Sequence, residues 1–295
     1  MNKKGLSFLL TGVLSIGLLM TGCSSSGGTA TEGSGVSTLE KAKKQGFVTV
    51  GFANEKPYAY ATPDGKLSGE AVEVAREVLK NMGIGEMNGV LTEFGSLIPG
   101  LNAKRFDIIT AGMYITPERA KEVAFANPEY SIGEALAVRK GNPKDLHSYR
   151  DIAEKKAKVG VMGGAIEIDY LKKSGVGDDQ LVIVTDQPSA VAALQSDRVD
   201  AITMTGPSLQ AVLDSAKDSG IERVMEFEQP VIDGKSIRGY GAAAFRKEDQ
   251  DFLEAYNNEL QKLKESGRLL EILEPFGFTE QELPGDMTAE QLVKE

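Results

Sequence analysis

The hydrophobic pattern of the first half of the chain alternates between strand-like and helix-like segments. Residues 47–52 form a β-rich run, and residues 69–81 carry apolar side chains at helical spacing. Two more strands are predicted at 90–94 and 106–110, with a short helix at 96–103 between them. This βαβαβ order favours a mainly parallel sheet with helices on its faces.

The same alternation begins again near Lys158. The predicted elements of this second unit are strand 159–161, helix 165–173, strand 181–184, helix 188–196, strand 201–204, helix 208–216 and strand 223–227. Two α/β units therefore follow each other, which predicts an α/β fold with two lobes.

Two strand-like stretches of small residues, 135–138 and 239–245, lie on either side of the second unit. They are candidates for two strands that cross between the lobes. A long helical pattern at 249–273 follows and is expected to pack back on the first lobe. Residues 38–138 with 239–295 are therefore assigned to lobe I, and residues 139–238 to lobe II.

The N-terminus has the order of a secretory signal. Lys3 and Lys4 precede an apolar run at 6–20, and small residues follow it. The run is shorter than the roughly twenty residues that cross a bilayer. Residues 1–22 are therefore predicted to be a signal peptide.

Cys23 is the only cysteine of the chain, and a lone cysteine in a secreted protein needs an explanation. Met20-Thr21-Gly22-Cys23 resembles the lipobox of bacterial lipoproteins, in which the cysteine is lipidated. The alternative is a chance cysteine beside an ordinary cleavage site. Ser, Gly and Thr dominate the residues that follow, so 23–37 is predicted to be a lipid anchor and flexible tether. The protein is then extracytoplasmic and attached to the cell membrane through lipid.

The composition narrows the possible partners. The formal net charge of −10 argues against nucleic acid, because phosphate binding requires a basic surface. A single cysteine excludes intramolecular disulfides, so the fold depends on its core.

Enzymatic motifs are missing from the sequence. The one histidine, His147, lies in a polar stretch, and there is no HExxH, GxSxG or phosphate-binding loop. We therefore expect no catalysis, no metal site and no cofactor.

Four motifs in the first half of the globular part suggest a family. They are Val48-Thr49-Val50-Gly51, Leu97-Ile98-Pro99-Gly100-Leu101, Arg105-Phe106-Asp107 and Ile115-Thr116-Pro117-Glu118-Arg119. With them, residues 39–278 resemble the solute-binding proteins of ABC importers of the polar amino-acid type, family 3. The resemblance implies a periplasmic-binding-protein-like fold of type II, with two crossing hinge strands and a ligand enclosed between the lobes.

Three further segments resemble the branch of this family that binds ectoine and hydroxyectoine. They are Glu55-Lys56-Pro57-Tyr58, Thr92-Glu93-Phe94 and Gly112-Met113-Tyr114. The resemblance places Gly112 among the pocket residues, together with the side chains considered next.

Arg119 follows a predicted strand, and ligands of open α/β sheets bind at the carboxyl ends of strands. Its guanidinium could hold a carboxylate through two parallel hydrogen bonds. From spacing alone, a surface arginine paired with Glu118 or Glu122 is an equal alternative, and the resemblance favours the binding function.

Glu55 follows the first strand and could pair with a cationic ligand group; the alternative is a solvated acid balanced by Lys56. Tyr58, Phe94 and Tyr114 follow or end three strands, and converging aromatic faces could enclose a delocalised cation. Core packing is the alternative for each and is nearly as strong for Phe94, but the three together favour the binding function. Tyr60 is a weaker candidate of the same kind.

The second lobe offers Gly163-Gly164-Ala165 between a strand and a helix, where backbone N–H groups could hold an anion. A tight turn that requires glycine is a compatible alternative. Thr205 stands about where the resemblance leads us to expect an aspartate that holds an α-ammonium group. This departure favours a solute whose positive charge is spread over a ring.

These observations predict a monomeric, membrane-anchored binding protein that captures a small zwitterionic, ectoine-like solute by closing its lobes and delivers it to an ABC permease. Ectoine supplies a carboxylate for Arg119 and an amidinium-like ring for the aromatic side chains. The alternatives are a polar amino acid or a betaine as ligand, or a dehydratase of the same fold that acts on small cyclic acids.

Overall fold

The first sheet is formed by the apolar runs of the first unit together with a strand from the C-terminal part. The computed structural model describes residues 35–217, 220–232 and 234–294. Strands β1 (Phe47–Phe52), β4 (Glu86–Leu91) and β5 (Ile108–Tyr114) run parallel, in the order β4-β1-β5. Antiparallel β15 (Gly239–Phe245) lies next to β5, and it also pairs with β6 (Ala124–Phe125) and β7 (Tyr130–Ile132). Lobe I is built around this sheet.

The second sheet repeats the same arrangement. Strands β9 (Val159–Met162), β10 (Leu181–Val184) and β11 (Ala201–Thr205) run parallel in the order β10-β9-β11. Antiparallel β8 (Glu134–Arg139) lies next to β11, and β12 (Ile221–Arg223) pairs with its other edge. The two α/β units predicted from the sequence are therefore confirmed.

The chain passes between the sheets twice. It crosses first at Gly133, between β7 and β8, and returns through the segment between β12 and β15. The predicted crossing strand 135–138 lies wholly in the second sheet, because its backbone pairs with β11 and β12. The sheets therefore divide the chain at Gly133, before the predicted boundary at Val138.

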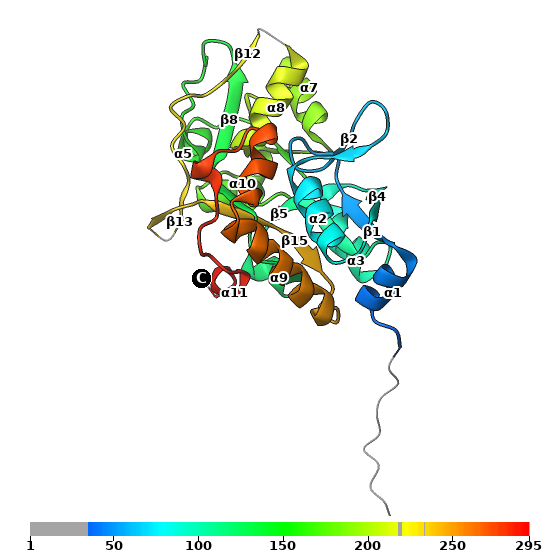
Figure 1. Cartoon of the computed structure of the whole chain (residues 1–295). Coiled ribbons are helices and arrows are strands. Elements are labelled where there is room, and N and C mark those ends of the chain that lie inside the picture. Colours follow the sequence, from blue (N-terminus) through cyan, green and yellow to red (C-terminus); the bar gives the residue numbers. More distant parts are fainter. Residues whose placement is uncertain (1–34, 218–219, 233, 295) are drawn as a thin grey trace, which may run out of the picture. The chain divides into compact units, whose positions relative to one another are not determined.

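Helices of lobe I cover both faces of its sheet. They are α1 (Thr38–Gln45), α2 (Glu70–Asn81), α3 (Leu97–Asn102), α4 (Pro117–Ala120), α9 (Gln250–Glu265), α10 (Arg268–Leu273) and α11 (Ala289–Leu292), with 3-10 turns η1 (Phe94–Ser96), η3 (Glu274–Phe276) and η4 (Glu280–Glu282). Apolar residues of α2, α9 and α10 share one buried cluster with β1 (Figure 1). The predicted return of the C-terminal helical pattern to the first lobe is thus confirmed.

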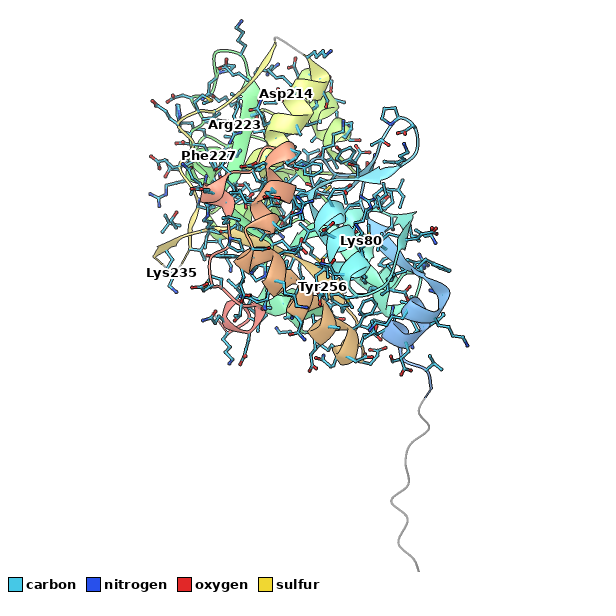
Figure 2. The ribbon with its side chains drawn as sticks, viewed as in Figure 1. Lys80, Asp214, Arg223, Phe227, Lys235 and Tyr256 are labelled. Carbon is cyan, nitrogen blue, oxygen red and sulfur yellow. The ribbon has the colours of Figure 1, made fainter. Side chains whose placement is uncertain are left out.

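Lobe II has helices α5 (Tyr149–Glu154), α6 (Glu167–Lys173), α7 (Gln187–Gln195) and α8 (Gly206–Ala216), with the 3-10 turn η2 (Asp178–Gln180). Two separate apolar clusters stabilise its sheet, one with α7 and α8 and one with α5 and α6. The remaining strands form two antiparallel pairs. Between β1 and α2 of lobe I, β2 (Tyr60–Ala61) pairs with β3 (Leu67–Ser68), and between β12 and β15, β13 (Val231–Ile232) pairs with β14 (Lys235–Ser236). Figure 2 shows Tyr256 in lobe I, and Arg223 and Phe227 in lobe II.

Three sequence predictions of elements are wrong. The strand predicted at 90–94 is β4, which ends at Leu91, and Phe94 begins a 3-10 turn. The strand predicted at 223–227 ends at Arg223, and Phe227 packs on Tyr149 with ring centroids 5.3 Å apart. The single long helix is two helices, because Gly267 adopts a left-handed conformation with φ of 77° between them.

The predicted signal peptide and Cys23 lie outside the described residues, as does most of the tether. Within residues 35–294, apart from 218–219 and 233, no helix has the length and apolar character needed to cross a membrane.

Candidate functional site: a cavity between the lobes

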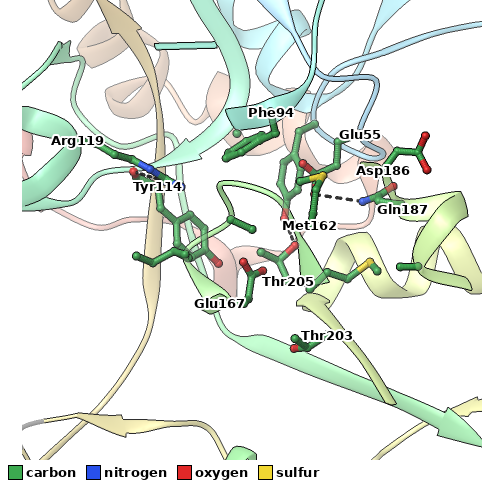
Figure 3. Close-up of a pocket in the computed structure, with 16 residues that line it drawn as sticks. Glu55, Phe94, Tyr114, Arg119, Met162, Glu167, Asp186, Gln187, Thr203 and Thr205 are labelled. Atoms are coloured by element: carbon green, nitrogen blue, oxygen red, sulfur yellow. Dashed lines mark hydrogen bonds between the residues drawn. The ribbon is translucent and has the colours of Figure 1, made fainter. Parts of the chain in front are cut away.

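A cavity that is partly open to solvent lies between the two lobes (Figure 3). Lobe I lines it with Glu55, Tyr58, Phe94, Gly112, Tyr114 and Arg119. Lobe II lines it with Met162, Ala165, Ile166, Glu167, Asp186, Gln187, Ala190, Thr203, Met204 and Thr205. Eight of the nine ligand-binding residues predicted from the sequence are in this lining, and Gly164 lies next to it.

The sheets explain this convergence. Glu55 and Phe94 follow β1 and β4, Tyr114 ends β5, and Thr205 ends β11. These strands are parallel within each lobe, so their carboxyl ends meet at one edge of each sheet. The two edges face each other across the cavity.

Arg119 is held by a short helix after β5. Thr116 caps this helix by accepting a hydrogen bond from the Arg119 backbone N–H, and Pro117 stands in its first turn. The guanidinium donates to the carbonyl of Tyr114 in lobe I (2.9 Å) and to the carbonyl of Gly164 in lobe II (3.0 Å). Its other three N–H groups have no acceptor among the described residues, so two of them remain for a carboxylate.

The alternative surface ion pair of Arg119 does not form. Glu118 pairs instead with Lys121, at 2.7 Å between Oε2 and Nζ. The Arg119 guanidinium carbon lies 5.4 Å from the centroid of the Phe94 ring, within the range of a cation–π contact. The arginine is therefore directed toward the cavity.

Glu55 is buried and is only 7% exposed, so it is not a solvated loop acid. Two side chains of lobe II donate to its Oε1, Ser208 at 2.9 Å and Gln187 at 3.1 Å. Burial raises the pKa of Glu55 to about 7, and the hydrogen bond from Ser208 opposes this rise. The carboxyl of Glu55 is therefore close to half ionised near neutral pH.

Gly112 allows Tyr58 and Tyr130 to pack together at the cavity. Its φ of +61° favours glycine, and a Cβ atom there would lie 2.5 Å from the Tyr58 ring. The Tyr130 hydroxyl donates to the Gly112 carbonyl at 2.7 Å, and the Tyr130 ring stacks on Tyr58 with centroids 5.4 Å apart. These contacts fix the position of Tyr58.

The other predicted aromatic residues differ in their surroundings. The Tyr114 ring lies against Gly239, where any Cβ atom would overlap it, and Phe94 is 8% exposed within an apolar cluster. Phe94 is thus both a core residue and a cavity residue. Tyr60 does not line the cavity, and its ring instead lies 5.3 Å from the Lys56 ammonium.

The glycine turn of lobe II has little capacity for an anion. The predicted helix begins only at Glu167, and the Gly163 and Ala165 N–H groups donate to backbone carbonyls of Val184 and Met162. Of these three N–H groups, only that of Gly164 remains available to an anion. A tight turn therefore explains the glycines better than an anion site does. Gly164 has φ of +81°, as such a turn requires.

Thr205 links the lobes. Its hydroxyl forms a hydrogen bond of 2.5 Å with the Tyr58 hydroxyl. Thr205 is uncharged, and it stands where the family resemblance led us to expect an aspartate.

Glycines of the two lobes are in close contact next to cavity residues Phe94 and Ala165. A Cβ atom on Gly164 would lie 2.6 Å from the Gly95 Cα, and one on Gly95 would lie 3.4 Å from the Gly163 carbonyl oxygen. Gly95 belongs to η1 of lobe I, whereas the other two belong to lobe II. We name this contact the glycine seam.

Sequence reasoning missed several residues of lobe II. Glu167, Gln187 and Ser208 all lie shortly after parallel strands of the second sheet and face the cavity or Glu55. The carboxyl-end rule that found the residues of lobe I applies to them equally. In the described part of the chain, no three His, Cys, Asp or Glu side chains are placed to hold a metal ion. His147 hydrogen-bonds Asp145 at 3.0 Å, away from the cavity.

Comparison with known proteins identifies the family. Residues 48–279 match the bacterial extracellular solute-binding proteins, family 3. A probable amino-acid ABC transporter periplasmic-binding protein of Sinorhizobium fredii is 36% identical over 263 residues, which cover 88% of this chain and 86% of the relative. The L-cystine-binding protein TcyJ of Escherichia coli is 28% identical, over 78% of this chain and 82% of its own. The crystal structure of EhuB in complex with hydroxyectoine superposes with a TM-score of 0.79 and 38% identity, covering 87% of this chain and 97% of EhuB. The chain therefore belongs to the bacterial extracellular solute-binding proteins of family 3.

Proposed function

We propose that this protein captures ectoine or hydroxyectoine outside the cytoplasm. The observation that carries the proposal is the meeting of Arg119, Glu55 and three aromatic side chains in one interlobe cavity. Ectoine has a carboxylate for the free N–H groups of Arg119 and a ring with a delocalised positive charge. Aromatic faces stabilise such a charge by roughly 0.5–2 kcal/mol each when water is excluded.

Two further observations support this ligand. The chain is 38% identical to EhuB, whose crystal structure contains hydroxyectoine. Thr205 provides no charge for a primary ammonium group, and its hydroxyl is already bonded to Tyr58. Thr205 therefore cannot supply the charged contact that an aspartate at this position would give a primary ammonium group.

The proposal includes closure of the lobes around the solute. The solute docks first on Arg119 and the aromatic residues of lobe I, and lobe II then closes over it by rotation at the two crossings. The hydrogen bonds from Arg119 to Gly164 and from Ser208 to Glu55 hold the closed arrangement. The exclusion of water strengthens the charged contacts.

We propose that capture of the solute by lobe closure is the first step of its import into the cell. The protein would be a monomeric lipoprotein, attached to the membrane through Cys23, that presents the closed, loaded form to an ABC permease. It binds its solute without converting it, which distinguishes it from dehydratases of similar fold.

A polar amino acid is the second candidate ligand. The observation that favours it is Glu167, a buried carboxyl of lobe II that lines the cavity and could hold an α-ammonium group. A carboxylate on Arg119 is common to both candidates, so only the cationic end distinguishes them.

Calorimetry with purified protein tests the proposal. We expect ectoine and hydroxyectoine to bind more tightly than glycine betaine, proline, arginine and glutamine, and to be recovered unchanged. Tighter binding of an amino acid would support the second candidate, and turnover of the solute would contradict the assignment as a binding protein.

Substitution of Phe94 tests the aromatic contact. We expect Phe94→Ala to weaken binding of ectoine by about tenfold, because a cation–π contact and apolar packing are lost. Phe94→Tyr retains the aromatic face and should bind nearly as tightly as the wild type. Equal losses in the two variants, measured by calorimetry, would show that the ring face is not the contact.

The raised pKa of Glu55 predicts that affinity depends on pH. Because the pKa of Glu55 is about 7 in the ligand-free protein, a cation bound beside it favours the carboxylate and releases a proton. Affinity should therefore be highest above this pKa and fall by up to about tenfold per pH unit below it. Titration calorimetry between about pH 5.5 and pH 8 measures this dependence. Affinity that is constant over this range would show that Glu55 does not contact the positive charge.

A further inference from the structure

The part of the cavity between Tyr114 and Thr205 is acidic. Glu167, from the first turn of α6, lies there with Tyr114 on one side and Thr205 on the other (Figure 3). It is 5% exposed, and the carboxyl of Glu134, at the start of β8, lies next to it with 3% exposure. Arg119 is the one basic side chain among the described lining residues, which include three acidic ones. Asp186 is exposed, so the carboxyl groups of the lining that are removed from water are those of Glu55 and Glu167.

The two carboxyl groups can share a proton. Neither oxygen of Glu134 has a hydrogen-bond donor among the described residues, and an unpaired buried carboxylate is costly. Burial, followed by the charge of Glu167, places the pKa of Glu134 well above its usual range. Burial raises the pKa of Glu167 as well, and hydrogen bonding and the charge of Arg119 oppose this rise. One proton shared between the two carboxyl groups therefore avoids two adjacent buried charges.

Other ionisable groups surround this pair on several elements. They are Glu55, Tyr114, Arg119, Tyr149 and Tyr170. Arg119 favours the ionised form of Glu167, whereas Glu55 and Glu167 repel each other across the cavity. The Tyr114 hydroxyl, also buried, has no hydrogen-bond partner within the described residues. A cation between Glu55 and Glu167 would relieve their repulsion.

We propose that Glu167 is a second acidic contact for the solute and binds an N–H group of its cationic part from lobe II. Glu134 is then a positioning residue, whose carboxyl proton bonds to Glu167 and keeps it oriented toward the cavity. This inference rests on the proposed function, and it adds that the positive part of the solute is held from both lobes. The ligand class is a zwitterion with at least one N–H donor on its cationic group.

Three variants test the pair. Glu167→Gln removes the charge, and we expect it to weaken binding of ectoine by about tenfold or more. Glu134→Gln keeps an N–H donor toward Glu167, so its affinity should stay within about threefold of the wild type. Glu167→Asp retains the charge and should recover part of the affinity lost in Glu167→Gln.

The difference in affinity for ectoine between Glu167→Gln and Glu134→Gln is the decisive result. Wild-type affinity in Glu167→Gln, or an equal loss in Glu134→Gln, would overturn the proposal. Thermal unfolding of the ligand-free variants separates loss of binding from loss of the fold.

A measurement without ligand separates this inference from the proposed function. If the wild-type protein binds neither ectoine nor hydroxyectoine, the proposed function fails. Carboxyl ¹³C shifts of the ligand-free protein then decide the state of the pair: a protonated Glu134 beside an ionised Glu167 at neutral pH supports the inference. Ionisation of both groups would overturn it.

Discussion

Arg119→Ala is expected to weaken ectoine binding by at least about a hundredfold, because truncation of one partner of a buried charge pair leaves the other unpaired. The side chain also links Tyr114 to Gly164 across the cavity, so the variant loses an interlobe hydrogen bond as well. Calorimetry with wild-type and variant protein measures the change.

Two control variants show whether the loss of affinity comes from the lost contact to the carboxylate. Arg119→Lys keeps the charge but cannot form two parallel hydrogen bonds to one carboxylate, so its affinity should lie between those of wild type and Arg119→Ala. Arg150→Ala removes an exposed arginine of α5 outside the cavity lining and should not change binding. Wild-type affinity in Arg119→Ala would show that the carboxylate is held elsewhere.

Gly95→Leu is expected to prevent closure of the lobes. Even a Cβ atom on Gly95 would lie 3.4 Å from the Gly163 carbonyl oxygen, so the rest of a leucine side chain would occupy the glycine seam. The lobe II contacts to the solute would then be lost, and affinity should fall by about a hundredfold if two charged hydrogen bonds are lost. Small-angle scattering should show compaction on addition of ectoine for the wild type and none for the variant.

Gly95→Ala is the matched control, since its single methyl group makes a close contact that a small shift can accommodate. Gly95 is exposed and its φ is not positive, so neither substitution should lower the thermal stability of the ligand-free protein. Compaction of Gly95→Leu with wild-type affinity would show that the seam does not limit closure.

The sequence predicted the central strands well, because their apolar runs are buried on both faces. Strands β1 and β15 were predicted with their observed bounds, and the βαβ pattern predicted that β1, β4 and β5 run parallel. The errors concern marginal elements. Strand β4 lies at the edge of its sheet with mostly exposed residues, so its apolar signal covers only Val90 and Leu91.

The crossing between the lobes was harder to place. Residues 134–138 are all buried, which indicates a central strand but not the sheet to which it belongs. Pairing with β11 and β12 decides this question, and those strands lie far along the chain. Gly133, between β7 and β8, is then the point where the chain leaves lobe I.

The site was predicted only in part. Arg119, Glu55 and the aromatic residues follow strands of the first unit and carry the family resemblance, so sequence reasoning brought them together. Glu167 looks like an ordinary acidic residue in the first turn of a helix. Its place shortly after β9 puts it at the carboxyl end of a strand, but no local pattern indicates its burial beside Glu134, at the start of β8.

A crystal structure of the protein with ectoine would examine the proposed binding mode at atomic detail. We expect the ectoine carboxylate to accept two hydrogen bonds from the Arg119 guanidinium, with the cationic ring against Phe94 and Tyr114 inside the closed cavity. A solute bound outside this cavity, or with its carboxylate away from Arg119, would contradict this binding mode.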